Sequence, residues 1–127
     1  MVLKFPGSLG DRGKQNQINI AAKRTLEGSQ SIIKADIWDR MRNQGIHEHT
    51  LQFANDALMQ DILSALALND LDSVKLEIEW VGTLLTHQKL PRTMLSDYLM
   101  VFAVAIARHA GEEAKLVSDW LVAAAAI

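Results

Sequence analysis

The sequence contains no cysteine, and this absence excludes several kinds of site at once. A chain without thiols forms no disulfide, binds no thiolate-held zinc or iron–sulfur cluster, and has no cysteine nucleophile. Long apolar runs are also missing, both in the form that a secretory signal requires and at the length of a membrane-spanning helix. From these absences we expect a cytoplasmic protein that does not enter a membrane.

Catalytic sequence motifs are missing as well. The chain has no His-Glu-x-x-His zinc motif, no Glu-x-x-His pair for a di-iron bundle, and no Gly-x-Ser-x-Gly elbow. Neither of the glycine-rich phosphate-binding fingerprints is present. We therefore predict that the protein is not an enzyme.

Helical periodicity, by contrast, runs along almost the whole chain of 127 residues, of which 49% are hydrophobic. Apolar residues recur at spacings of three and four, as in the stripe of Leu51, Leu58 and Ile62, which Phe53 widens. No alternating strand pattern competes with this period. The predicted helical segments are 15–27, 29–45, 50–68, 71–85, 95–106 and 112–127. We predict an all-α bundle of five or six antiparallel helices, four of which form the main core.

Glycine, proline and short polar residues set the predicted helix boundaries. Gly28 is placed to end the first helix and Gly45 to end the second, since glycine readily adopts the left-handed conformation. Ser29 or Ser31 would cap the second helix. Pro91 breaks the chain before the fifth segment. Gly111 either bends the last helical stretch or splits it in two.

The first 14 residues differ from the rest, because they contain Pro6 and three glycines. We predict an N-terminal arm at 1–14 that is disordered until it binds something, followed by a single domain at 15–127. Residues 1–42 carry a net charge of +4 and the remaining residues carry −6, which together give the −2 of the whole chain. These charges either complement each other within the protein or across an oligomer, or they dock the arm on an anionic partner. Nucleic acid is not favoured, because acidic residues dilute the basic ones.

Four histidines are the candidate ligands for a metal or a haem. His47 and His49 lie two residues apart, so within a helix they would point to opposite sides. The stretch therefore reads as a helix entry with Thr50 as the cap. His87 and His109 lie at predicted helix ends, where an imidazolium also suits the helix dipole. Ligation of a metal or haem by these histidines is the alternative interpretation.

The tryptophans Trp38, Trp80 and Trp120 lie at or beside the apolar stripes of their predicted helices. Tryptophan at such a boundary either packs on the core or anchors an interface. Trp80 favours an interface most, since it lies off the apolar line and beside Glu77 and Glu79. The C-terminal stretch that includes Leu121 is apolar and would dock on the chain's own bundle or on a second copy.

Residues 65–108 are similar to the helical module that precedes cobalamin-binding domains in bacterial sensory and regulatory proteins. The similarity consists of a leucine-rich helix, a short Asn-Asp turn, a helix that ends near a proline-containing loop, and a long helix entered by a Leu-Pro step. The corresponding pieces here are Leu66–Leu71, Val74–Leu85 and Leu90–Ile106. The Asp-x-His-x-x-Gly motif of the cobalamin domain is absent, so no cobalamin and no ligand residue is carried over. The resemblance implies a helical regulatory or interaction module that acts as a dimer.

Taken together, these patterns favour a non-enzymatic helical regulatory or signalling domain that self-associates, binds a protein partner and needs no cofactor. The alternative is a sensor whose bundle interior holds haem, a pigment or another small apolar ligand. In that case Met59, Met94 and Met100 would line the pocket together with the tryptophans.

Overall fold

The computed structural model describes the backbone of residues 5–126 and the side chains of residues 13–126. Within these residues the chain is helical, with short turns and no strand, as the all-α prediction requires. The α-helices are α1 (Phe5–Met41), α2 (Glu48–Ala67), α3 (Lys75–His87), α4 (Thr93–Ala110) and α5 (Lys115–Ala125). Two short 3-10 helices, η1 (Leu71–Val74) and η2 (Gly111–Ala114), lead into α3 and α5. No described helix is both long enough and apolar enough to cross a membrane.

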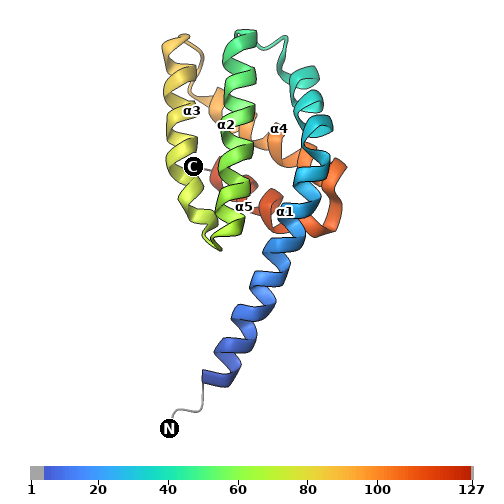
Figure 1. Cartoon of the computed structure of the whole chain (residues 1–127). Coiled ribbons are helices and arrows are strands. Elements are labelled where there is room, and N and C mark those ends of the chain that lie inside the picture. The colour runs from blue at the N-terminus through green and yellow to red at the C-terminus, as the bar shows by residue number, and fades with distance from the viewer. Residues whose placement is uncertain (1–4, 127) are drawn as a thin grey trace.

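Helices α1, α2 and α3 lie side by side with α2 in the middle, and α4 and α5 cross behind α2 (Figure 1). The core lies between these two sets. Helix α1 contributes one buried stripe at helical spacing, and α4 packs closely on both α1 and α5. The core residues with no exposed surface include Leu26, Ile33, Ile37, Leu58, Met59, Ile62, Phe102, Ile106, Val117 and Leu121. The apolar stripes predicted from the sequence therefore form the core, with the exception of Phe53 on α2.

Helix α1 corrects the predicted segmentation, because segments 15–27 and 29–45 belong to one continuous helix. Gly28 lies inside it, in open space and with an ordinary helical φ. A helix-interior glycine costs about 1 kcal/mol relative to alanine. Burial of Leu26 on one side and Ile33 on the other outweighs that cost. The predicted caps Ser29 and Ser31 are consequently interior residues of the helix.

The other glycine and proline signals act as the sequence indicated. Gly45 has a φ of 89° in the turn that follows α1, and Pro91 lies between α3 and α4. Gly111 has a φ of 66° and begins η2, so it separates α4 from α5. Left-handed φ values of this kind favour glycine because it has no Cβ to clash.

The N-terminal part of α1 extends beyond the bundle (Figure 1). Side chains 13–18 are all exposed, and Asn19 is the first buried one in the described part of α1. We call residues 5–18 the projecting segment. Of the predicted arm, residues 1–4 lie outside the described residues, and residues 5–14 form the first turns of α1.

The junction between the projecting segment and the bundle is held by a cluster of amides. Asn19 Nδ2 donates to Asn69 Oδ1 at 2.7 Å, and Asn69 Nδ2 donates to Asn16 Oδ1 at 3.2 Å. Gln15 Nε2 donates to Asn19 Oδ1 at 3.0 Å. Asn69 presents its amide from the turn after α2, where it adopts a φ of 56° that asparagine tolerates well. These bonds fix where α1 leaves the bundle.

Candidate functional site

Two aromatic rings pack against each other on the outer surface of α2 and α3. The ring centroids of Phe53 and Trp80 are 6.2 Å apart with the planes tilted by 57°. Phe53 is 66% exposed and Trp80 is 37% exposed. Both lie off the buried stripes of their helices, which run through Leu58 on α2 and Val81 on α3. An exposed aromatic pair beside other apolar side chains makes this surface a candidate contact site for another molecule.

Two carboxylates, Asp61 and Glu77, lie next to this aromatic pair. Burial raises the pKa of Asp61, and burial together with the negative charge of Asp61 raises the pKa of Glu77. Neither carboxylate forms an ion pair with any described side chain. The site therefore holds acidic charge that the fold leaves unneutralised.

Leu76 extends the apolar part of this surface, since it is 74% exposed. It lines a shallow hollow of about 350 Å³ together with both carboxylates, Ser73 and Trp80. We call this surface the acidic–aromatic face and define it by Phe53, Asp61, Leu76, Glu77 and Trp80. Its chemistry suits a partner that brings apolar and cationic groups together.

The negative charge of the face follows from the local sequence. Residues 43–74, which contain all of α2, include five Asp or Glu residues and no Lys or Arg. No basic side chain of α2 is therefore available to neutralise Asp61. Charge segregation of this kind raises the local potential and attracts cations over a distance of about 10 Å at 0.1 M salt.

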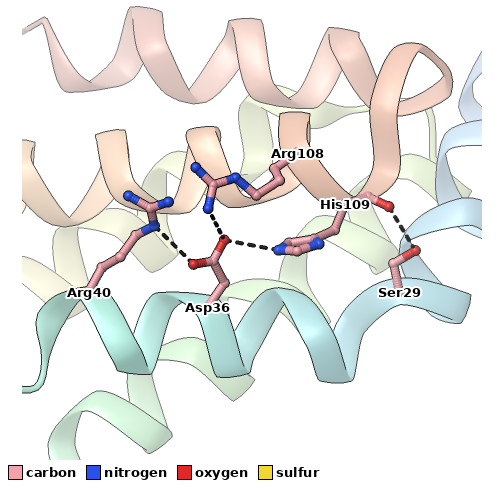
Figure 2. A network of polar contacts seen from close by, with 5 residues as sticks. All are labelled: Ser29, Asp36, Arg40, Arg108 and His109. Carbon is pink, nitrogen blue, oxygen red and sulfur yellow. Dashed lines mark hydrogen bonds and ion pairs between the residues drawn. The ribbon is translucent and has the colours of Figure 1, made fainter.

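A second polar cluster joins α1 to α4 around Asp36 (Figure 2). Arg40 Nε donates to Asp36 Oδ1 at 2.9 Å, and His109 Nε2 lies 2.9 Å from Asp36 Oδ2. Arg108 Nη1 lies 3.7 Å from the same oxygen. Burial alone would raise the pKa of Asp36, but the hydrogen bonds from Arg40 and His109 and the charges of Arg40 and Arg108 together lower it.

The Asp36 cluster is built as a structural connection. The Ser29 hydroxyl donates to the backbone carbonyl of His109 at 3.4 Å and is directed away from the imidazole ring (Figure 2). Serine and histidine are thus not arranged as a nucleophile and its base. The side chain of Asp36 is 13% exposed, so the ion pairs are partly shielded from water. The cluster locks the position of α4 on α1.

The four candidate histidines do not converge on one site. His109 binds Asp36, as described, and His87 is the exposed last residue of α3. His47 and His49 are exposed on either side of the start of α2 at Glu48. Within residues 13–126, no group of three or more His, Asp or Glu residues is arranged to hold a metal ion.

The helix entry at α2 is organised differently from the prediction. The residue before the helix is His47, not Thr50, and its side chain makes no capping bond. Gln88 stabilises this corner instead, because its Oε1 accepts from the His47 backbone N–H at 3.4 Å. Its Nε2 donates to the Thr50 hydroxyl at 2.6 Å. The sequence held no local signal for this contact, since the two residues are far apart in the chain.

Of the predicted interface residues, Trp80 lies on the exposed face and the other three are held against the bundle. Trp38 and Trp120 are partly buried against the core, and Trp120 Nε1 donates to Asp72 Oδ1 at 2.9 Å. Leu121 is fully buried and contributes to the core. Phe53, which the sequence pattern placed in the α2 stripe, is on the outer surface. Its position about 200° from Leu51 around the helix is the signal that indicates this.

A separate cavity of about 450 Å³ lies between α3 and α5. Its walls are Asp72, Lys75, Ile78, Glu79, Trp120, Ala123 and Ala124. Met59 and Met94 are buried elsewhere in the core and Met100 is exposed, so none of these predicted lining residues borders the cavity. The four histidines do not border it either.

No protein-family model, no curated protein and no solved structure matches this chain.

Proposed function

We propose that the protein is a non-enzymatic helical interaction domain that self-associates and binds a protein partner through the acidic–aromatic face. The observation that carries this proposal is the packed and exposed pair of Phe53 and Trp80 beside two unpaired carboxylates. Aromatic side chains are enriched among the residues that dominate binding energy in protein interfaces. Moving an exposed phenylalanine into an apolar contact is worth about 1.5–3 kcal/mol, enough to anchor an interface.

The similarity of residues 65–108 to a bacterial regulatory module supports the same category. On this basis we propose a regulatory or signalling role in the cytoplasm, as an antiparallel bundle that works as a dimer. The resemblance covers the α3 part of this face, with Leu76, Glu77 and Trp80, and leaves out Phe53 and Asp61 on α2.

The test is the oligomeric state of the purified full chain, measured by light scattering coupled to size exclusion at low micromolar concentration. We expect a dimer or larger assembly for the wild type and a shift to monomer for Phe53→Ala. Met100→Ala is the control, since Met100 is also an exposed apolar residue, at 39%, but lies on α4. A monomeric wild type, or equal shifts for both variants, would contradict self-association through this face.

A second candidate function rests on the cavity between α3 and α5. Its volume falls within the range of pockets that hold small ligands, and Trp120, Ile78 and two alanines give it an apolar lining. We propose, as the alternative, a sensor that binds a small apolar molecule there. The absorbance spectrum of the purified protein would reveal a haem or a pigment. For a colourless ligand, an apolar fluorescent dye should bind the wild type and lose affinity for Ala123→Leu, which narrows the cavity.

A further inference from the structure

The projecting segment of α1 is hydrogen-bonded to its own bundle at its base, through Asn16 and Asn69, and none of its described side chains is buried. Side chains 13–18 are all exposed, including Ile18 at 49%. The segment also contains Gly7, Gly10 and Gly13, each of which disfavours helix by about 1 kcal/mol relative to alanine. Because the segment continues the packed part of α1, it needs no nucleation of its own, but its exposed glycine-containing turns would gain stability from packing on another surface.

The charge of this region is opposite to that of the acidic–aromatic face. The projecting segment contains Arg12 and Lys14 against Asp11, which gives it a net charge of +1, and the next charged residues along α1 are Lys23 and Arg24. Lys14 is exposed and makes no ion pair with a described side chain, just as Asp61 and Glu77 make none. The chain therefore carries two surfaces with unsatisfied charge of opposite sign. Complementary patches of this kind set both the specificity and the rate of association.

The projecting segment is long enough to cover the face, and its spacing matches. Residues 5–18 rise about 20 Å, whereas the face extends about 12 Å along α2 from Phe53 to Asp61 and about 6 Å along α3 from Leu76 to Trp80. Lys14 and Ile18 are four residues apart and so lie on one side of α1. Glu77 and Trp80 are three residues apart and lie on one side of α3. One turn of each helix thus presents a charge followed by an apolar group.

We infer that the projecting segment of α1 lies along the acidic–aromatic face of a second copy of this chain, and that the second copy returns the contact. Lys14 pairs with Glu77, and Ile18 packs on the aromatic rings. The exchange is reciprocal, so it closes as a two-fold dimer and leaves neither surface open. This inference rests on the proposed function, because it names the occupant of the same face.

The geometry favours a second copy over the chain's own face. The amide cluster of Asn16, Asn19 and Asn69 holds α1 at the turn after α2, and from there the projecting segment leads away from the bundle (Figure 1). Folding back onto the same chain would require α1 to break next to these hydrogen bonds. Contact with a second copy keeps the helix continuous.

The test is a charge exchange in the full chain, read by sedimentation equilibrium. Lys14→Glu reverses the charge on the projecting segment, and Glu77→Lys reverses it on the face. Because each variant places like charges opposite each other at both contacts of its dimer, we expect the dissociation constant to rise about tenfold or more. Arg42→Glu and Glu113→Lys are the controls, since they make the same charge changes at exposed positions on other parts of the surface.

Mixing the two variants gives the decisive result. In a mixed pair, the glutamate introduced by Lys14→Glu in one copy faces the lysine introduced by Glu77→Lys in the other copy. The second contact of the same pair keeps the native Lys14 and Glu77, so wild-type affinity should return. Circular dichroism of each variant verifies that it is folded. If neither variant weakens the dimer, or if mixing restores nothing, the projecting segment is not the occupant.

The same measurements separate this inference from the proposed function. If Phe53→Ala dissociates the dimer while Lys14→Glu does not, the face is an interface but is filled by another surface of the second copy. If the wild type is monomeric throughout, both proposals fail. Weaker dimerisation at high salt is expected as well, because salt screens the exposed charges on both surfaces.

Discussion

Two carboxylate sites on this molecule have opposite surroundings. Asp36, between α1 and α4, is contacted by Arg40, Arg108 and His109, and its pKa is lowered. Glu77, on the surface of α3, has Asp61 as its charged neighbour, and its pKa is raised. At Asp36 the fold neutralises a partly buried negative charge. At Glu77 it places a second negative charge nearby. Unmatched charge beside exposed aromatic rings does not contribute to the stability of the fold in the way that the Asp36 cluster does, and this difference is the basis of the interaction that we propose for the face.

The largest expected effect comes from breaking the Asp36 cluster. Asp36→Asn removes the charge that holds Arg40 and His109 together, and we expect a loss of about 1–3 kcal/mol in the free energy of unfolding. Denaturant titration at neutral pH measures this loss, best in a Phe53→Ala background that separates folding from association. Asp39→Asn is the matched control, because Asp39 is an exposed residue of the same helix. Equal effects of the two substitutions would show that the cluster contributes nothing specific.

The stabilisation by Asp36 should also depend on pH in a defined direction. Its pKa is lower in the folded protein than the ordinary value of 3.8, so the folded state favours the charged form. The stabilising contribution is complete above that ordinary value and is lost as the pH falls through the lowered pKa. The difference in stability between the wild type and Asp36→Asn should therefore shrink in acid. A difference that grew in acid would mean that the pKa of Asp36 is raised.

A smaller effect on stability is expected from glycine substitutions in α1, and it should differ between the two halves of the helix. Gly28→Ala should stabilise the bundle by about 1 kcal/mol, because the glycine lies in a packed helix with open space for a methyl group. Gly13→Ala also meets open space, but it lies in the projecting segment. It should leave the unfolding of the monomeric bundle unchanged and strengthen the dimer instead. Thermal unfolding and sedimentation equilibrium of both variants distinguish these outcomes.

The sequence was sufficient to predict which residues form the core, but not which residues meet at the surface. Burial of Leu26, Ile33 and Leu58 follows from helical spacing, since the period alone determines which residues share a side. The break at Gly28 was wrong because local propensity was outweighed by packing that forms only in the complete fold. Pairing of Asp36 with His109 depends on how α4 lies across α1, and no local pattern encodes that arrangement.

Trp80 shows how much of the candidate site could be predicted from the sequence. Its place off the apolar stripe and beside Glu77 and Glu79 indicated an interface residue, and the structure places it on the exposed surface. Its neighbours on α2 could not be inferred in the same way. Phe53 and Asp61 join the face only because α2 lies beside α3, and that contact is a property of the fold. The separation of basic and acidic residues along the chain was visible in the sequence. The projecting segment and the acidic–aromatic face that carry these charges were not.

A small change in stability should come from Glu77→Gln, which tests the comparison of the two carboxylate sites most directly. In the monomer we expect a gain of about 0.5 kcal/mol or less, because the substitution removes a charge that burial and Asp61 disfavour. Since the pKa of Glu77 is raised in the folded state, this gain should disappear as the pH falls toward the ordinary value of 4.5, where the wild-type side chain is itself protonated.

Association should respond to Glu77→Gln in the opposite direction, with a weaker dimer at neutral pH, because the positive partner of the carboxylate is then unpaired. Glu113→Gln serves as the control and should change neither quantity. A more stable monomer together with a weaker dimer identifies a residue retained for binding at the expense of the fold. If stability and association fell together, Glu77 would instead belong with Asp36, among the charges that hold the bundle itself.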